Sequence, residues 1–147
     1  MSAPDLTQRP PRSPRVRLGG YVCLPRLLDK CRAELAGTNG DYHYNCPLDQ
    51  SFLKFVGIDA ERLKKEAATG KTDGEMLDWI NAHATYQRNP HDIAQWGVWR
   101  EQAAPSDHET RAYFNQLHEQ VGPHRTDIVG WCDLLDLDDY VSFGGKA

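Results

Sequence analysis

Apolar residues recur three and four positions apart along most of the chain, which is the spacing of amphipathic helices. The first such stripe lies in residues 21–36 and consists of Leu24, Leu27, Leu28, Cys31 and Leu35. Gly37 follows it as a helix stop. The same pattern predicts further helices over 47–57, 59–70, 72–84, 89–100, 106–122 and from Thr126 to Leu135.

Helix-start signals precede several of these segments. Thr72 to Glu75 fits a capping box, in which the first and fourth residues satisfy each other's backbone amides. Ser106 to Glu109 fits a second one, and Asn89-Pro90 supplies a cap followed by a proline suited to the first helical position. No predicted helix exceeds about five turns, so we expect a compact non-parallel bundle rather than a long four-helix bundle.

Two segments fall outside the helical pattern. Residues 41–45 alternate in character and could form a tiny strand or hairpin. Residues 1–16 hold four prolines between Pro4 and Pro14, and proline favours an extended backbone. The expected fold is all-α: a single compact domain of about six or seven short helices over residues 17–147, preceded by an extended arm rich in proline and arginine over residues 1–16.

The composition fits a globular protein of the cytoplasm. Of the 147 residues, 39% are hydrophobic and 26% charged, and no apolar run is long enough to cross a membrane. The polar start lacks the apolar stretch of a secretory signal. The four cysteines have no C-x-x-C spacing and are too few for a disulfide framework, so we expect a reducing compartment.

Charge is spread unevenly along the chain. The formal net charge is −4, yet residues 1–32 contain seven basic and only two acidic residues. The basic arm could contact phosphate or nucleic acid, or it could pair with the acidic remainder of the same chain or of a second copy. An acidic overall balance and an arm without interleaved aromatic residues argue against nucleic acid. An interaction module or homo-oligomer built on the arm therefore stays as one functional hypothesis.

Polar and aromatic residues are densest between residues 41 and 49. Cys46 precedes a helix start, where the helix dipole favours a thiolate, and His43 could act as its base or exchange a proton with a ligand. The structural alternative is that the two tyrosines pack on the core and the polar residues cap the helix. The candidate catalytic residues are His43, Asp49 and Tyr44. The candidate binding residues are Tyr42, Asn45 and Cys46, with Trp96 and Trp99 as an apolar wall.

These residues favour a small-molecule-binding protein, or a small enzyme that uses acid–base chemistry, with a pocket beside the 41–49 loop. The six histidines and four cysteines form no H-E-x-x-H motif and no zinc-finger spacing, so we expect no metal site. No glycine-rich phosphate loop and no nucleophile elbow is present, and we expect no cofactor.

Several stretches distributed over the chain resemble a family of small bacterial proteins known as a domain of unknown function. They are Pro4–Thr7, Pro11–Pro14, Leu24–Lys30, Tyr42–Tyr44, Cys46–Asp49, Asp73–Ile80 and Leu134–Leu137. The resemblance covers residues from about Pro4 to Phe143. It implies a bacterial, cytoplasmic, single-domain protein, and it supplies no catalytic residues.

Overall fold

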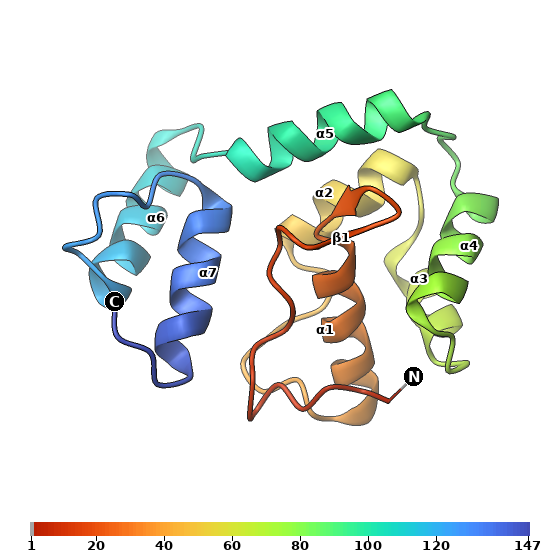
Figure 1. The fold of residues 1–147 in the computed structure, drawn as a ribbon, viewed down its shortest axis with the longest axis horizontal. Helices are drawn as coiled ribbons and strands as arrows, with labels where there is room; N and C mark the ends of the chain where they lie inside the picture. Colours follow the sequence, from red (N-terminus) through yellow and green to blue (C-terminus); the bar gives the residue numbers. More distant parts are fainter. Residues whose placement is uncertain (1) are drawn as a thin grey trace.

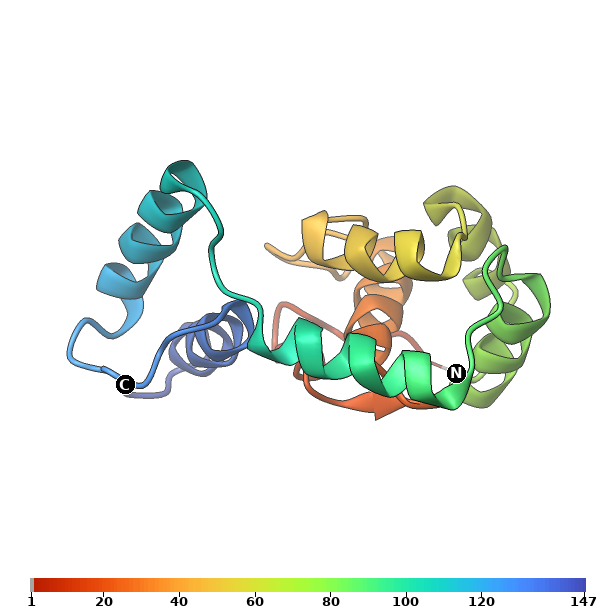
Figure 2. The same ribbon diagram turned by 90° about the horizontal axis from the view of Figure 1, so that it is seen from above.

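The computed structural model describes residues 2–147. These residues form seven helices and one two-stranded antiparallel sheet (Figures 1 and 2), which confirms the predicted all-α class. The strands are β1 (Arg17–Leu18) and β2 (Tyr21–Val22). The helices are α1 (Leu24–Ala36), α2 (Pro47–Val56), α3 (Ala60–Ala67), α4 (Asp73–His83), α5 (Pro90–Gln102), α6 (His108–Val121) and α7 (Trp131–Ser142).

Local capping explains where most helices begin. The capping box predicted at Thr72 is present, with the Thr72 hydroxyl accepting from the Glu75 amide and the Glu75 carboxylate accepting from the Thr72 amide. Asn89 likewise accepts from the Asp92 amide at the start of α5. The signal at Ser106 was one residue early, because the side chain of Asp107 caps α6.

The last helix begins later than the sequence pattern predicts. It starts at Trp131 rather than near Thr126, and the preceding residues form turns. The reason lies within the helix, where the Asp133 carboxylate reaches back and accepts hydrogen bonds from the amides of Val129 and Gly130. This carboxylate satisfies backbone donors that a helix start leaves unpaired.

The small sheet lies at residues 17–22 and not at 41–45. Gly19 and Gly20 both have positive φ, 58° and 85°, which is what a two-residue hairpin turn of the favoured type requires. Leu18 therefore pairs directly with Tyr21. The 41–45 segment instead forms turns, and Asn45 itself takes the left-handed conformation (φ 66°), which is incompatible with an extended strand.

Two hydrophobic clusters stabilise the fold. The larger one fills the space between the β1–β2 hairpin and α1–α4, a unit that we call the main lobe. The smaller one joins α6 to α7, and we call these two helices the C-terminal lobe. Helix α5 runs along one edge of the molecule and connects the lobes (Figures 1 and 2).

The proline-rich arm lies against both lobes rather than apart from them. Leu6 is buried, its amide donates to the Thr38 carbonyl (2.8 Å), and Pro11 and Pro14 are also buried. Arg12 pairs with Asp29 on α1 and with Asp73 at the start of α4. The arm is therefore an integral part of the surface of the folded chain.

Within residues 2–147, no helix combines the length and the apolar character that a membrane crossing requires.

Candidate functional site

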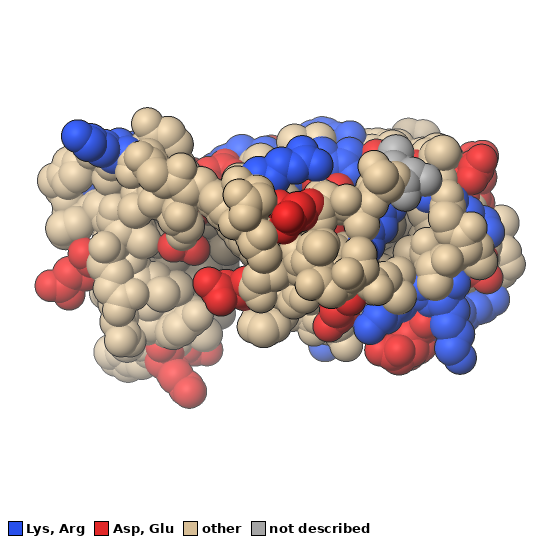
Figure 3. Space-filling view, turned by 90° about the horizontal axis from the view of Figure 1, so that it is seen from below, with Lys and Arg blue, Asp and Glu red and all other residues tan. Residues whose placement is uncertain are grey.

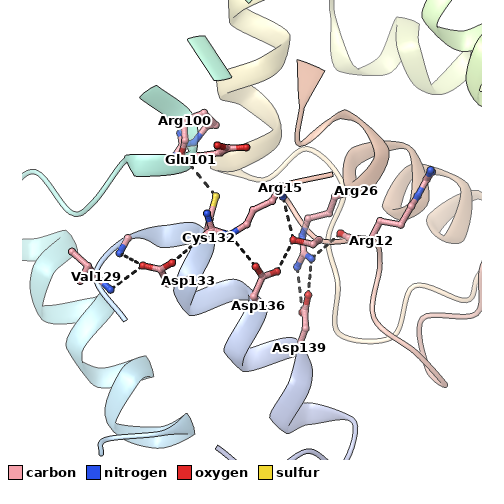
Figure 4. Close-up of polar contacts among 12 residues, drawn as sticks. Arg12, Arg15, Arg26, Arg100, Glu101, Val129, Cys132, Asp133, Asp136 and Asp139 are labelled. Atoms are coloured by element: carbon pink, nitrogen blue, oxygen red, sulfur yellow. Dashed lines mark hydrogen bonds and ion pairs between the residues drawn. The ribbon is translucent and has the colours of Figure 1, made fainter. Parts of the chain in front are cut away.

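A row of carboxylates on α7 joins the C-terminal lobe to the rest of the molecule. Asp133, Asp136 and Asp139 are three residues apart, so they share one face of the helix. Arg15 of the arm pairs with Asp133 and Asp136 (Figure 4). The Ser13 hydroxyl also donates to Asp136 (2.7 Å). The contact between the lobes on this side is therefore polar.

The innermost contact of this row is a buried ion pair. Arg26 on α1 donates to both carboxylate oxygens of Asp139 at 2.7 and 3.3 Å, and their side chains are 4% and 8% exposed. The Tyr42 hydroxyl donates to the same carboxylate at 2.7 Å. Burial first, and then this hydrogen bond, raises the pKa of Tyr42 above its usual value, so its phenol stays protonated.

A cleft of about 830 Å³ lies in front of this ion pair, between the lobes. One wall comes from the 40–48 segment, α1 and the arm, and the other from α6 and α7. The lining residues are Leu6, Thr7, Arg26, Lys30, Gly40, Asp41, Tyr42, His43, Cys46, Leu48, Tyr113, Leu135, Asp138, Ser142 and Phe143. Figure 3 shows acidic and basic side chains along the junction of the two lobes.

A second buried ion pair lies at the floor of the cleft, with Lys30 lining it and Asp49 beneath it. Lys30 lies 2.9 Å from Asp49 Oδ2, with side chains that are 4% and 1% exposed. The same ammonium donates to Cys46 Sγ (3.2 Å), and the Asn45 amide donates to Asp49 Oδ2 (2.9 Å). The other Asp49 oxygen is buried and has no hydrogen-bond partner among residues 2–147. Lys30 thus connects the core carboxylate to the thiol that lines the cleft.

Asp138 is the acidic group of the opposite wall. It is half-buried on α7, next to Asp139. Burial and then the neighbouring Asp139 charge raise its pKa above the usual value, against the smaller opposing effects of Arg26 and of a hydrogen bond with Ser142.

The structure brings three of the predicted site residues together in the cleft, namely Tyr42, His43 and Cys46. His43 is exposed, whereas Tyr42 and Cys46 are half-buried. Asn45 is exposed nearby and hydrogen-bonds Gln50.

The remaining predicted residues lie elsewhere. Tyr44 is buried and donates its hydroxyl to the Ala60 carbonyl (2.7 Å), and Asp49 lies beneath the cleft floor. Trp96 stacks on Phe55 in the main core, with ring centres 5.0 Å apart. Trp99 is 56% exposed and lines a separate surface hollow between α5 and α7. Neither tryptophan is among the residues that line the cleft.

Sequence reasoning missed Arg26, Lys30 and Asp138. Arg26 and Lys30 lie off the apolar stripe of α1 and would ordinarily be solvated, and Asp138 belongs to a run of acidic residues. Arg26 is buried against Asp139 of α7 and the Arg12 carbonyl of the arm, whereas Lys30 is buried against Asp49 of α2 and Cys46. One available signal was the sequence position of Lys30, one turn after Arg26, which puts both charges on one helical face.

Metal-ligating side chains are dispersed in this molecule. Within residues 2–147 no three His, Cys, Asp or Glu residues are grouped closely enough to hold an ion, and the four cysteines are free thiols. The groups that the cleft offers to a ligand are a histidine, two phenols, two hydroxyls, a thiol, two paired cations and two carboxylates.

Comparison with models of known protein families gives a match over most of the chain. The model of the family described as Domain of unknown function (DUF5069) matches residues 8–141, which is most of the chain. No curated protein matches. The match includes the second half of the arm, most of the cleft lining and nearly all of both lobes, and the chain belongs to the DUF5069 family.

Proposed function

We propose that this protein binds a small polar molecule in the cleft between its lobes, and that His43 exchanges a proton with the bound molecule. The observation that carries the proposal is that Tyr42, His43 and Cys46 line one cleft together with two buried cations, Arg26 and Lys30. The volume of about 830 Å³ falls within the range of roughly 300 to 1,000 Å³ that small-molecule sites occupy.

The cost of burying charge supports a functional role for this region. Burying an ionised side chain is unfavourable even when it is paired, and apolar residues of similar size commonly stabilise a fold as well or better. Here Arg26 and Lys30, with their partners, are buried at a cleft wall rather than in an apolar core. Charged groups kept at a concave site in this way are typical of ligand binding.

His43 is the residue best suited to proton exchange. Histidine is the usual general acid or base near neutral pH, and His43 is exposed on the cleft wall, where a ligand can reach it. Tyr42 serves a different purpose, because its hydroxyl donates a hydrogen bond to Asp139 and its raised pKa keeps the phenol protonated. It orients a ligand and closes the back of the cleft.

The alternative, an interaction module built on the basic arm, receives less support. Arg12, Arg15 and Arg17 all form ion pairs with carboxylates of their own chain. Docking on a partner would first require these contacts to be broken.

The experiment compares His43→Ala with His91→Ala, a matched control at an exposed histidine on α5. Each variant and the wild type are screened by ligand-observed NMR against a library of small amines, carboxylates and neutral fragments, and their melting temperatures are measured. We expect His43→Ala to lose or weaken binding with an unchanged melting temperature, and His91→Ala to behave like the wild type. Unfolding of His43→Ala, or binding that survives unchanged, would refute the role of His43.

A further inference from the structure

We infer that the molecule bound in the cleft is a small organic cation, such as an amine, rather than an anion. The inference rests on the proposed function, since it names the chemical class of ligand for the same cleft.

The charges that line the cleft do not balance. Each of its two cations already has a buried carboxylate partner, Asp139 for Arg26 and Asp49 for Lys30. Asp41 and Asp138 also line the cleft, and neither forms an ion pair within residues 2–147. The charges of the two ion pairs cancel, which leaves the carboxylates of Asp41 and Asp138 without a counter-charge. The negative potential of these two groups attracts a positively charged ligand.

Asp138 provides the most direct contact point. It is half-buried on α7, and the charged groups around it are Asp139 on its own helix and Arg26 on α1, with Ser142 as a hydrogen-bonding neighbour. Burial raises the pKa of this carboxyl, as does Asp139, and the opposing effects of Arg26 and Ser142 leave the ionised form without full compensation in the unliganded protein. A ligand cation would supply that compensation, because an opposite charge nearby stabilises the ionised form.

Aromatic rings form a second feature suited to a cation. Tyr42, His43, Tyr113 and Phe143 all line the cleft. The face of an aromatic ring attracts a cation electrostatically, and amine-binding sites commonly combine such rings with a carboxylate. The Tyr42 ring already makes this type of contact with the Arg26 guanidinium, whose carbon lies 5.6 Å from the ring centre.

An anionic ligand would have to use Arg26 or Lys30, and both are less available than their charges suggest. Arg26 donates three hydrogen bonds, two to Asp139 and one to the Arg12 carbonyl. Lys30 contacts Asp49 and Cys46. An anion in the cleft would also be repelled by the two unpaired carboxylates that line it.

The test uses three probes of nearly equal size and different charge: benzylamine, benzyl alcohol and benzoate. Each is titrated into the full chain near neutral pH and low salt, and amide shifts report affinity and location. We expect benzylamine to bind in the cleft about three- to tenfold more tightly than benzyl alcohol, and benzoate to bind most weakly. Asp138→Asn should reduce the benzylamine advantage, and Asp78→Asn, an exposed acid on α4 that changes net charge equally, should not.

The outcomes separate this inference from the proposed function. Benzoate binding in the cleft as tightly as benzylamine, or an Asp138→Asn variant with full benzylamine affinity, would overturn the cation assignment and leave a ligand-binding cleft in place. A second readout on the wild type is the pH dependence, since benzylamine affinity should fall as acidification protonates Asp138. If none of the three probes shifts cleft residues, the proposed function fails and the cation assignment fails with it.

Discussion

The guanidinium of Arg26 on α1 lies 2.7 Å from the carboxylate of Asp139 on α7, so one buried ion pair joins the two lobes directly behind the cleft. The same carboxylate accepts a hydrogen bond from the hydroxyl of Tyr42, which lines the cleft. The relative position of the cleft walls therefore depends on a contact whose partners are 113 residues apart in the chain.

The first prediction concerns this ion pair. Arg26→Met should lower the free energy of unfolding by about 3–5 kcal/mol, because it leaves the Asp139 charge buried and unpaired. Asp139→Leu should lower the free energy of unfolding by a similar amount, because it leaves the Arg26 charge buried and unpaired. The double variant should be markedly more stable than the sum of the single losses predicts, since no uncompensated charge remains. Chemical denaturation of the four proteins measures the coupling, and strictly additive losses would contradict the pairing.

The second prediction follows from Asp138. Its raised pKa means that folding favours the protonated form, so the ionised carboxylate lowers the free energy of unfolding. This loss of stability grows as pH rises through the folded-state pKa. Asp138→Asn should therefore raise the melting temperature near pH 7 by about 1–3 °C. The difference from the wild type should disappear at a pH low enough to protonate Asp138 in both states. A variant less stable than the wild type near pH 7 would contradict this account.

The third prediction concerns the cysteines. Burial raises the pKa of Cys23 and of Cys31 to about 12 and also raises that of Cys132, so all three should resist alkylation in the folded state. Cys46 alone is half-buried and lines the cleft, with the Lys30 ammonium beside its sulfur. Iodoacetamide should modify one thiol per folded chain, identified by peptide mass spectrometry as Cys46.

The control for that labelling is Cys46→Ser, in which the fast modification should vanish and the fold should persist. Equal rates at all four cysteines of the folded wild type, or a fast phase that survives in Cys46→Ser, would contradict the assignment.

The fourth prediction concerns the attachment of the arm. Asp73 accepts hydrogen bonds from Arg12 of the arm and Arg32 of α1, which outweigh its burial and lower its pKa. A lowered pKa contributes stability above the unfolded-state value, and this is lost as pH falls through the folded-state value. Asp73→Asn should thus lower the free energy of unfolding by about 1–3 kcal/mol at neutral pH, and by progressively less below about pH 4. Thermal unfolding over this pH range measures the difference in stability between the wild type and the variant. A difference that does not change with pH would argue against the ion pairs as its cause.

Much of the helical arrangement could be predicted because its signals are local. The caps at Thr72 and Asn89 and the stop at Gly37 act within one turn of helix, and the structure has all three. The hairpin was missed because Gly19-Gly20 indicates only a bend unless the flanking two-residue strands are recognised. The start of α7 was misplaced because Asp133 caps from inside the helix.

The site could be predicted only in part, for a related reason. The loop residues Tyr42, His43 and Cys46 are close in sequence, so their composition alone identified one wall of the cleft. The opposite wall comes from α6 and α7, and its position depends on hydrogen bonds and ion pairs between residues more than 100 positions apart. No periodicity or motif encodes such a contact.

The most direct test of the cleft as a ligand site is a map of amide shift changes in the full chain, titrated in turn with the members of the small-fragment library. The account predicts that the residues that shift cluster in the 40–48 segment and in the second half of α7, with His43 and Asp138 among them. Shifts that cluster instead around Trp99 and Trp131 between α5 and α7, or no shifts with any fragment, would contradict it.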